Sequence, residues 1–304
     1  MTRAIPPLDI IGDSLLTSST IPEPDTGEAA WNAGTAYVAG DEAYYTDHII
    51  YTRLVNGTTA TTPDLDTTNW EPTRYTNKYA MFDMYRNTQS TDASPIEVVL
   101  TPGERVNTLV VAGMTNVNTL EVVVTSGGTE VYTYIEDLNT REVVDWYGYF
   151  FEPFSTRSEV VLLTIPPYSN AVITVTLTAT SGSPSVGYLA IGNNVFMGYA
   201  QYGATSRAIN LSTFTRNANT GTVEMIPKRN IPIVDVRIFA AKSLSAILYN
   251  LRDAAAGMSL IWTGIDDSSD YFFKPLFAIG AYKNFEINVE HLSHTIVNLS
   301  IEEI

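Results

Sequence analysis

Strict alternation of apolar and polar residues constrains this chain more than any other feature of its sequence. Between residues 171 and 179, Ile173, Val175 and Leu177 are each separated from the next by a threonine. Successive side chains of a strand point to opposite faces, so this segment predicts a strand with one buried face. A chain built from such segments must stack its sheets to bury those faces.

The same alternation recurs in short segments that turns separate. Residues 96–100 alternate before a turn signal at 101–103, and residues 121–125 and 131–135 flank the glycine pair at 127–128. Glycine and proline supply the backbone angles that tight turns require. Serial short strands joined by such turns predict an antiparallel β-sandwich.

The C-terminal third adds one helix to further strands. Apolar residues recur there at three- and four-residue steps, which is the spacing of one helix face: Leu244, Ile247, Leu248, Leu251 and Ala255. Gly257 is expected to end the helix. Strands are expected at 234–240, 259–262, 285–289 and 295–301. This third of the chain therefore predicts an α+β domain, which we expect to mediate assembly.

The fold class expected for the chain is mainly β and multidomain, since 304 residues exceed the usual size of one β domain. We predict four parts: an N-terminal arm at 1–27, a small three-stranded aromatic module at 28–72, an antiparallel β-sandwich at 73–205 and an α+β assembly domain at 206–304. The arm is expected because its last residues, 20–27, are rich in proline and threonine.

Charge and composition disfavour several classes of partner. The formal net charge is -16 at pH 7, and nucleic-acid affinity depends on basic residues that displace counterions, so no nucleic-acid partner is expected. An acidic chain also binds anionic membrane surfaces poorly, and no apolar run reaches the length of a membrane span. Residues 1–9 lack the basic start and apolar core of a signal peptide, so we expect synthesis in the cytosol. The absence of cysteine excludes disulfides and thiolate chemistry.

One short motif points to hydrolysis. Gly12-Asp13-Ser14-Leu15 resembles the nucleophile block of GDSL-type hydrolases, in which a serine at the end of the first strand attacks an ester. Such a serine needs a general base, which that family supplies from an Asp-x-x-His block. None of the three histidines, His48, His291 and His294, has an aspartate three residues before it. We therefore predict no catalytic residue and no enzyme.

Two groups of residues have the chemistry of metal ligands but not the spacing. His291 and His294 lie near Glu290 in a strand-like segment, where residues three apart face opposite sides. The acidic run at 266–270 lacks the spacing and terminal glutamate of an EF-hand and is typical of an exposed turn. No metal and no cofactor is expected.

Residues 28–72 are rich in aromatic side chains, and a module of this size needs large rings to supply its buried area. The candidate residues for carbohydrate contact are Trp31, Tyr37, Tyr44, Tyr45, Tyr51 and Trp70. Their order, together with Gly40-Asp41 as a tight turn, resembles carbohydrate-binding modules of families 5 and 12, which bind chitin and cellulose. Trp31, Tyr37, Tyr51 and Trp70 match framework positions of that family.

The segment after Tyr51 departs from the family pattern. Chitin-binding members carry adjacent exposed tryptophans there, which stack on sugar rings, whereas this chain has only non-aromatic residues from Thr52 to Gly57. Two interpretations of the module's rings therefore stay open: the core of a small fold, or contact with a glycan in which Tyr44, Tyr45 and His48 offer a substitute surface.

Further segments resemble phage tail proteins. They include the block from Thr76 to Asp83 with Thr88-Gln89, then 190–192, 201–204 and the C-terminal run from Gly280 to Glu302. The resemblance implies a virion structural protein of the tail tip or baseplate, localised in the virion. Its expected partners are other tail and baseplate proteins, further copies of itself and a host cell-surface glycan. The alternatives are a stand-alone carbohydrate-binding protein and a GDSL-like esterase acting on surface polysaccharide.

Overall fold

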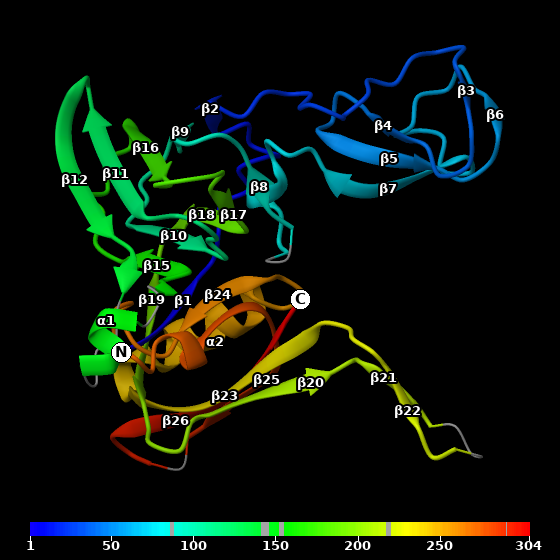
Figure 1. Ribbon diagram of the computed structural model, residues 1–304. Helices are drawn as coiled ribbons and strands as arrows, with labels where there is room; N and C mark the ends of the chain where they lie inside the picture. Colours follow the sequence, from blue (N-terminus) through cyan, green and yellow to red (C-terminus); the bar gives the residue numbers. More distant parts are fainter. Residues whose placement is uncertain (86–87, 141–145, 152–154, 217–219, 290) are drawn as a thin grey trace. The chain divides into compact units, whose positions relative to one another are not determined.

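A computed structural model describes residues 1–85, 88–140, 146–151, 155–216, 220–289 and 291–304 (Figure 1). Strands account for 48% of the chain and helices for 8%, so the predicted mainly β, multi-sheet fold is confirmed. The chain forms two compact units. One contains Asp9–Val160 and Ile165–Ala190, and the other contains Met1–Leu8, Val161–Thr164 and Ile191–Ile304.

The first unit is built on a five-stranded antiparallel sheet. Its strands, in spatial order, are β12 (Thr129–Asp137), β11 (Thr119–Ser126), β16 (Ala171–Thr178), β9 (Ile96–Leu100) and β2 (Leu16–Ser19). Val98, Val122 and Val175 pair across it and are fully buried, while the alternate residues stay in contact with solvent. The period-two pattern thus leaves one face of the sheet open.

A second sheet of three strands accompanies it, in the order β15 (Glu159–Leu162), β10 (Thr108–Ala112) and β18 (Tyr188–Gly192). Every residue of these strands is buried, so both faces of this sheet are covered. Two-residue ladders complete this part: β8 (Ser90–Thr91) with β17 (Ser185–Val186), and β13 (Asn139–Thr140) with β14 (Ser155–Thr156).

The aromatic module has the predicted three-stranded sheet, in the order β4 (Glu42–Tyr44), β5 (Ile49–Arg53) and β7 (Trp70–Tyr75). A short pair, β3 (Ala36–Tyr37) and β6 (Gly57–Thr58), lies beside it in the chain. Gly40 has φ +95° between β3 and β4, as a tight turn at Gly40-Asp41 requires. A 3-10 turn follows the module at Ala80–Phe82.

The second unit is a closed antiparallel barrel. Its sheet runs in the order β19 (Val195–Ala200), β1 (Thr2–Ile5), β24 (Leu260–Thr263), β25 (Phe277–Asn288), β26 (His294–Glu303), β23 (Asn230–Ala241) and β20 (Thr205–Asn210). Because β19 also pairs with β23, the first six strands form a ring, and β20 remains outside it as an edge strand. Closure satisfies the backbone groups that open edges would leave unpaired.

Helix α2 (Ser245–Ala254) contributes to the core of the barrel unit. Leu248 and Leu251 are its buried residues and pack with Trp262, whose indole Nε1 donates a hydrogen bond of 2.9 Å to the Gly280 carbonyl. Gly257 follows the helix with φ +77°, so the predicted helix and its stop are confirmed. Short 3-10 turns lie at Lys242–Leu244 and Lys274–Leu276. No helix among the described residues is long and apolar enough to cross a membrane.

The compact units differ from the predicted domain boundaries. Residues 1–27 are not a separate arm, because β1 pairs with β19 and β24 in the barrel and β2 pairs with β9 in the sandwich sheet. The second unit also begins before residue 206, since it includes β19. Strands of four residues carry too little alternation to be recognised without their partners.

A two-stranded hairpin extends the edge of the barrel. It consists of β21 (Thr213–Arg216) and β22 (Val223–Ile226), which pair only with each other and lie between β20 and β23 in the chain (Figure 1). Sequence analysis did not predict these strands.

Barrel closure depends on a glycine at the point where β19 passes from one neighbour to the other. Gly198 pairs with Thr2 of β1, and the next residue, Tyr199, pairs with Phe239 of β23. Gly198 has φ +129°, and a Cβ added there would lie 2.3 Å from the Phe239 carbonyl oxygen. The three strands can meet only where the residue lacks a side chain.

We therefore predict that Gly198→Ala lowers the free energy of unfolding by more than about 2 kcal/mol, measured by urea denaturation. Gly203→Ala is the matched control, because Gly203 also has a positive φ (+96°) but a Cβ there meets nothing within 4 Å. It should cost only the backbone strain, about 1 kcal/mol. Equal effects of the two substitutions would show that the close approach does not matter.

Candidate functional site

Two of the six candidate carbohydrate-contact residues form the core of the module. Trp70 is 1% exposed and Tyr51 is 5% exposed, and both pack with Ala43. Tyr51 lies on the central strand β5, and Trp70 begins β7 beside it. Rings buried to this extent stabilise the module and cannot present a face to a sugar.

The other four candidates are half-buried, and three of them, Trp31, Tyr37 and Tyr45, pack against that core. Trp31 contacts Tyr45 edge to face, with ring centroids 5.8 Å apart, and Tyr37 contacts Trp70 in the same way at 4.9 Å. The Tyr37 hydroxyl also accepts a hydrogen bond of 2.9 Å from the backbone N–H of Asn32. The structure thus groups these rings about one small core and leaves part of their surface accessible.

Burial raises the pKa of two tyrosines in the module. For Tyr51 desolvation is the largest cause, and the hydroxyl donates a hydrogen bond to the Asp47 carboxylate, which raises its pKa further. The pKa of Tyr44 is raised by desolvation and then by the charges of Glu23, Asp47 and Glu28. Both phenols are protonated at neutral pH, and the Tyr51 hydroxyl donates to Asp47.

Arg53 holds the segment that follows Tyr51, and sequence analysis missed it. This arginine is only 3% exposed; its guanidinium lies 5.1 Å from the Trp70 ring, and its Nε donates to the Val55 carbonyl at 2.6 Å. Among the described residues its Nη1 has no hydrogen-bond partner, nor has Nε1 of Trp70. A cation stacked on an indole gains electrostatic energy that partly offsets its desolvation.

Aliphatic side chains occupy the surface where the resembled modules carry stacking tryptophans. Leu54 and Val55 are 44% and 53% exposed, and Val38 is 56% exposed. The backbone N–H of Ala39 donates to the Asn56 side chain at 2.7 Å, which links the two loops that carry these residues. Aliphatic groups offer no flat π face, so this surface differs chemically from a chitin platform.

His48 has a structural role in a network that ties residues 23–28 to the module. Its Nδ1 lies 2.9 Å from Oε1 of Glu23, which also accepts a 2.8 Å hydrogen bond from the Thr76 hydroxyl. The His48 ring stacks on Tyr79 with centroids 3.9 Å apart. Glu28 accepts a hydrogen bond of 2.8 Å from the backbone N–H of Asn77. The sequence of residues 20–27, rich in proline and threonine, did not indicate that Glu23 binds His48 and Thr76.

The GDSL-like segment forms a turn rather than the end of a strand. The N–H of Asp13 donates to the Asp9 carbonyl at 3.1 Å, and that of Ser14 donates to the Ile11 carbonyl at 3.2 Å. Ser14 has φ +52°, and the Asp9 carboxylate accepts a hydrogen bond of 2.7 Å from the N–H of Gly12. Ser14 thus does not have the position that a serine nucleophile has in the resembled hydrolases.

The two C-terminal histidines were predicted to face opposite sides of a strand, and this was wrong. Residues 291–293 form a bend before β26, which brings the rings of His291 and His294 together at 4.2 Å. Glu290, named with them, lies outside the described residues. Asp266, from the acidic run, pairs with Arg3 at 2.8 Å in a turn. Within the described part of the chain no cluster of three or more His, Cys, Asp or Glu could hold a metal ion.

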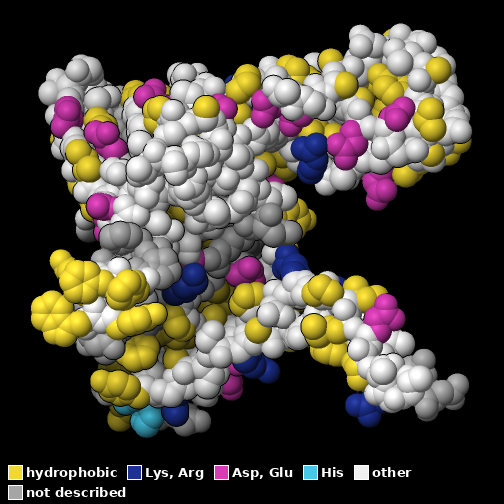
Figure 2. Space-filling model, viewed as in Figure 1, with side chains coloured by type: hydrophobic (Ala, Val, Ile, Leu, Met, Phe, Trp, Pro, Cys, Tyr) yellow, Lys and Arg dark blue, Asp and Glu magenta, His cyan; other side chains and the backbone are white. Residues whose placement is uncertain are grey.

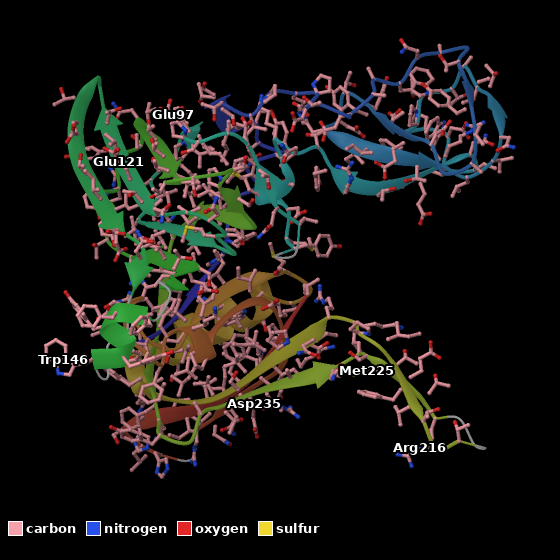
Figure 3. All side chains as sticks on the ribbon, in the orientation of Figure 1. Glu97, Glu121, Trp146, Arg216, Met225 and Asp235 are labelled. Atoms are coloured by element: carbon pink, nitrogen blue, oxygen red, sulfur yellow. The ribbon has the colours of Figure 1, made fainter. Side chains whose placement is uncertain are left out.

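A cluster of exposed aromatic rings lies on helix α1 (Trp146–Phe151), which sequence analysis did not single out (Figure 2). Each of its large side chains is at least half exposed: Trp146 79%, Tyr147 71%, Tyr149 52%, Phe150 65% and Phe151 70%. Several of these rings contact one another, as in the stacked pair Trp146 and Phe150, whose ring centroids are 6.4 Å apart. Figure 3 shows Trp146 directed away from the strands. At about 150–250 Å² per ring, the cluster exposes roughly 600 Å².

The hairpin is a second exposed surface. Every described residue from Thr205 to Asn230 is exposed except Ser212, which is half-buried. Large apolar side chains are among them: Ile209, Leu211, Phe214, Val223, Met225 and Ile226. The largest exposed apolar patch of a typical monomer measures about 300–600 Å² and is often a functional surface. Helix α1 and the hairpin are therefore the candidate functional surfaces, together with the module.

Because Trp70 forms the core of the module, we predict that Trp70→Ala lowers its local stability by about 3–5 kcal/mol. Hydrogen exchange of the β5 amides in the full chain measures this opening free energy. Leu54→Ala, at an exposed position of the same module, should change it by less than about 0.5 kcal/mol. If the β5 amides of the Trp70→Ala variant exchange as slowly as those of the unmodified chain, Trp70 does not stabilise the module.

Comparison with known proteins assigns no family. No family model matches the chain, and no curated protein matches it. The resemblances to carbohydrate-binding modules and phage tail proteins therefore stay predictions.

Proposed function

We propose that this chain is a virion structural protein of a phage tail tip or baseplate that assembles through exposed apolar surfaces. The observation that carries the proposal is the aromatic cluster on α1. Its exposed area of roughly 600 Å² approaches the ~800 Å² that each partner contributes to a standard protein interface. Tryptophan, tyrosine and phenylalanine are also the residues enriched at interface cores.

The proposal accounts for two further properties of the chain. Blocks that resemble phage tail proteins occur in both compact units, as expected if the whole chain serves one assembly. The net charge of -16 keeps free copies apart in solution, which limits non-specific association through the exposed rings. Association then requires surfaces whose shape and charge match.

We predict that the double substitution Trp146→Ser and Phe150→Ser abolishes assembly, because it removes the two stacked rings of the cluster. Mass photometry and electron microscopy should find discrete oligomers of the unmodified chain and only monomers of the variant. The chain should also be detected in particles released from the host that carries its gene, and the variant should be lost from them.

Leu65→Ser is the matched control, since Leu65 is 74% exposed but belongs to the module and not to the cluster. It should assemble like the unmodified chain. A strictly monomeric unmodified chain that is absent from particles would overturn the proposal.

Glycan attachment through the module is a second candidate function, favoured by the partial exposure of Trp31, Tyr44 and Tyr45. Sugars bind proteins by stacking on flat rings and by hydrogen bonds, and these three residues offer both. On a glycan array, Trp31→Ala or Tyr45→Ala should abolish binding while the fold is retained, and Val55→Ala should leave it intact. If the unmodified chain binds no glycan, the module is structural only.

A further inference from the structure

Few contacts of its own stabilise the hairpin β21–β22, which continues the β20–β23 ladder beyond the barrel. Its strands pair only with each other, and all of their residues are exposed. An isolated two-stranded hairpin is marginal in water unless a third strand or another surface covers one of its faces. A long exposed hairpin at the edge of a sheet is also a site for unwanted pairing. Both properties indicate that something covers it.

The register of the hairpin divides it into a mostly apolar and a mostly polar face. Phe214 pairs with Met225, and Arg216 pairs with Val223, so these four side chains share one face. The alternate pairs, Thr213 with Ile226 and Thr215 with Glu224, lie on the other face, where Ile226 is the one large apolar side chain. Figure 3 shows Met225 and Arg216 on the hairpin. One face therefore presents three apolar side chains and a guanidinium.

The charge of the hairpin segment is opposite to that of the remaining chain. Residues 205–230 contain four basic residues and a single acidic one, Glu224. The remaining residues contain 13 basic and 32 acidic ones, from the totals of 17 and 33. Arg207 is paired with Asp235 at 3.0 Å at the base of the segment. A cationic segment of an acidic chain is complementary to another copy of that chain.

The open face of the five-stranded sheet has the matching chemistry. In one row across it, Glu97 lies opposite Thr176, which lies opposite Glu121. In the adjacent row Val99 and Val123 flank Thr174, and all three are half-buried. Ile135, opposite Glu121, is 63% exposed. The open face thus combines aliphatic side chains with carboxylates, among them those of Glu97 and Glu121.

We propose that the hairpin of one copy docks on the open sheet face of a second copy. Phe214, Val223 and Met225 cover the aliphatic side chains, and Arg216 pairs with the carboxylates of Glu97 and Glu121. The contact buries the mostly apolar face of the hairpin against the sheet of the second copy. This inference rests on the proposed assembly function and names one partner in it.

Charge reversal tests the contact in the full chain. Arg216→Glu should raise the dissociation constant for self-association at least about tenfold in sedimentation velocity, and Glu121→Arg should do the same. The double variant, Arg216→Glu with Glu121→Arg, should recover most of the affinity because the pair is restored with opposite polarity. Lys242→Glu is the control, since it makes the same change in net charge at an exposed position outside the hairpin.

Failure of this contact is distinguishable from failure of the proposed function. If both single variants associate as tightly as the unmodified chain, or the double variant gains nothing over them, the hairpin does not bind this face, although assembly through α1 stands. If the unmodified chain stays monomeric and is absent from particles, both proposals fail. Circular dichroism identifies variants that do not fold; Phe214→Ser, which leaves every charge in place, should then weaken association independently.

Discussion

The structure of the barrel unit depends on closure of its seven-stranded sheet. Strand β19 pairs with β1 on one side and with β23 on the other, so six strands form a ring around a core that includes Trp262 and two leucines of α2. The ring closes only where Gly198 lets three backbones approach. Because β19 pairs with one end of β23 and β20 with the other, the closure also determines where the sheet has an edge. The exposed hairpin continues from that edge.

Local periodicity in the sequence predicted much of the fold. The alternation at 171–179 and the three- and four-residue spacing at 244–255 are contained within single elements, and the structure confirms both. The strands that sequence analysis missed in residues 1–27 pair with strands that lie far away in the chain. The four residues of β1 form a strand by pairing with β19 and β24, which lie almost 200 and 260 positions later in the chain. For the same reason the predicted N-terminal arm does not exist as a separate part.

Composition could not separate buried rings from exposed ones. The candidate site of six rings was chosen because small modules need aromatic residues, and the structure makes Tyr51 and Trp70 core residues for that reason. Five of the six residues of α1 are also aromatic, yet each of these five residues is at least half exposed. Exposure therefore directs the functional interpretation away from the module and toward α1, the hairpin and the open sheet face. All three expose apolar side chains, and the cationic hairpin and the acidic sheet face are also complementary in charge.

We propose that the hairpin, exposed along its whole described length in the single chain, becomes covered on assembly. Hydrogen–deuterium exchange of the β21 and β22 amides, measured below and above the concentration at which the chain associates, tests it most directly. These amides should exchange almost as fast as those of an unstructured peptide in the monomer, and at least about a hundredfold more slowly in the oligomer. Equal rates in both states, while the chain demonstrably associates, would contradict it.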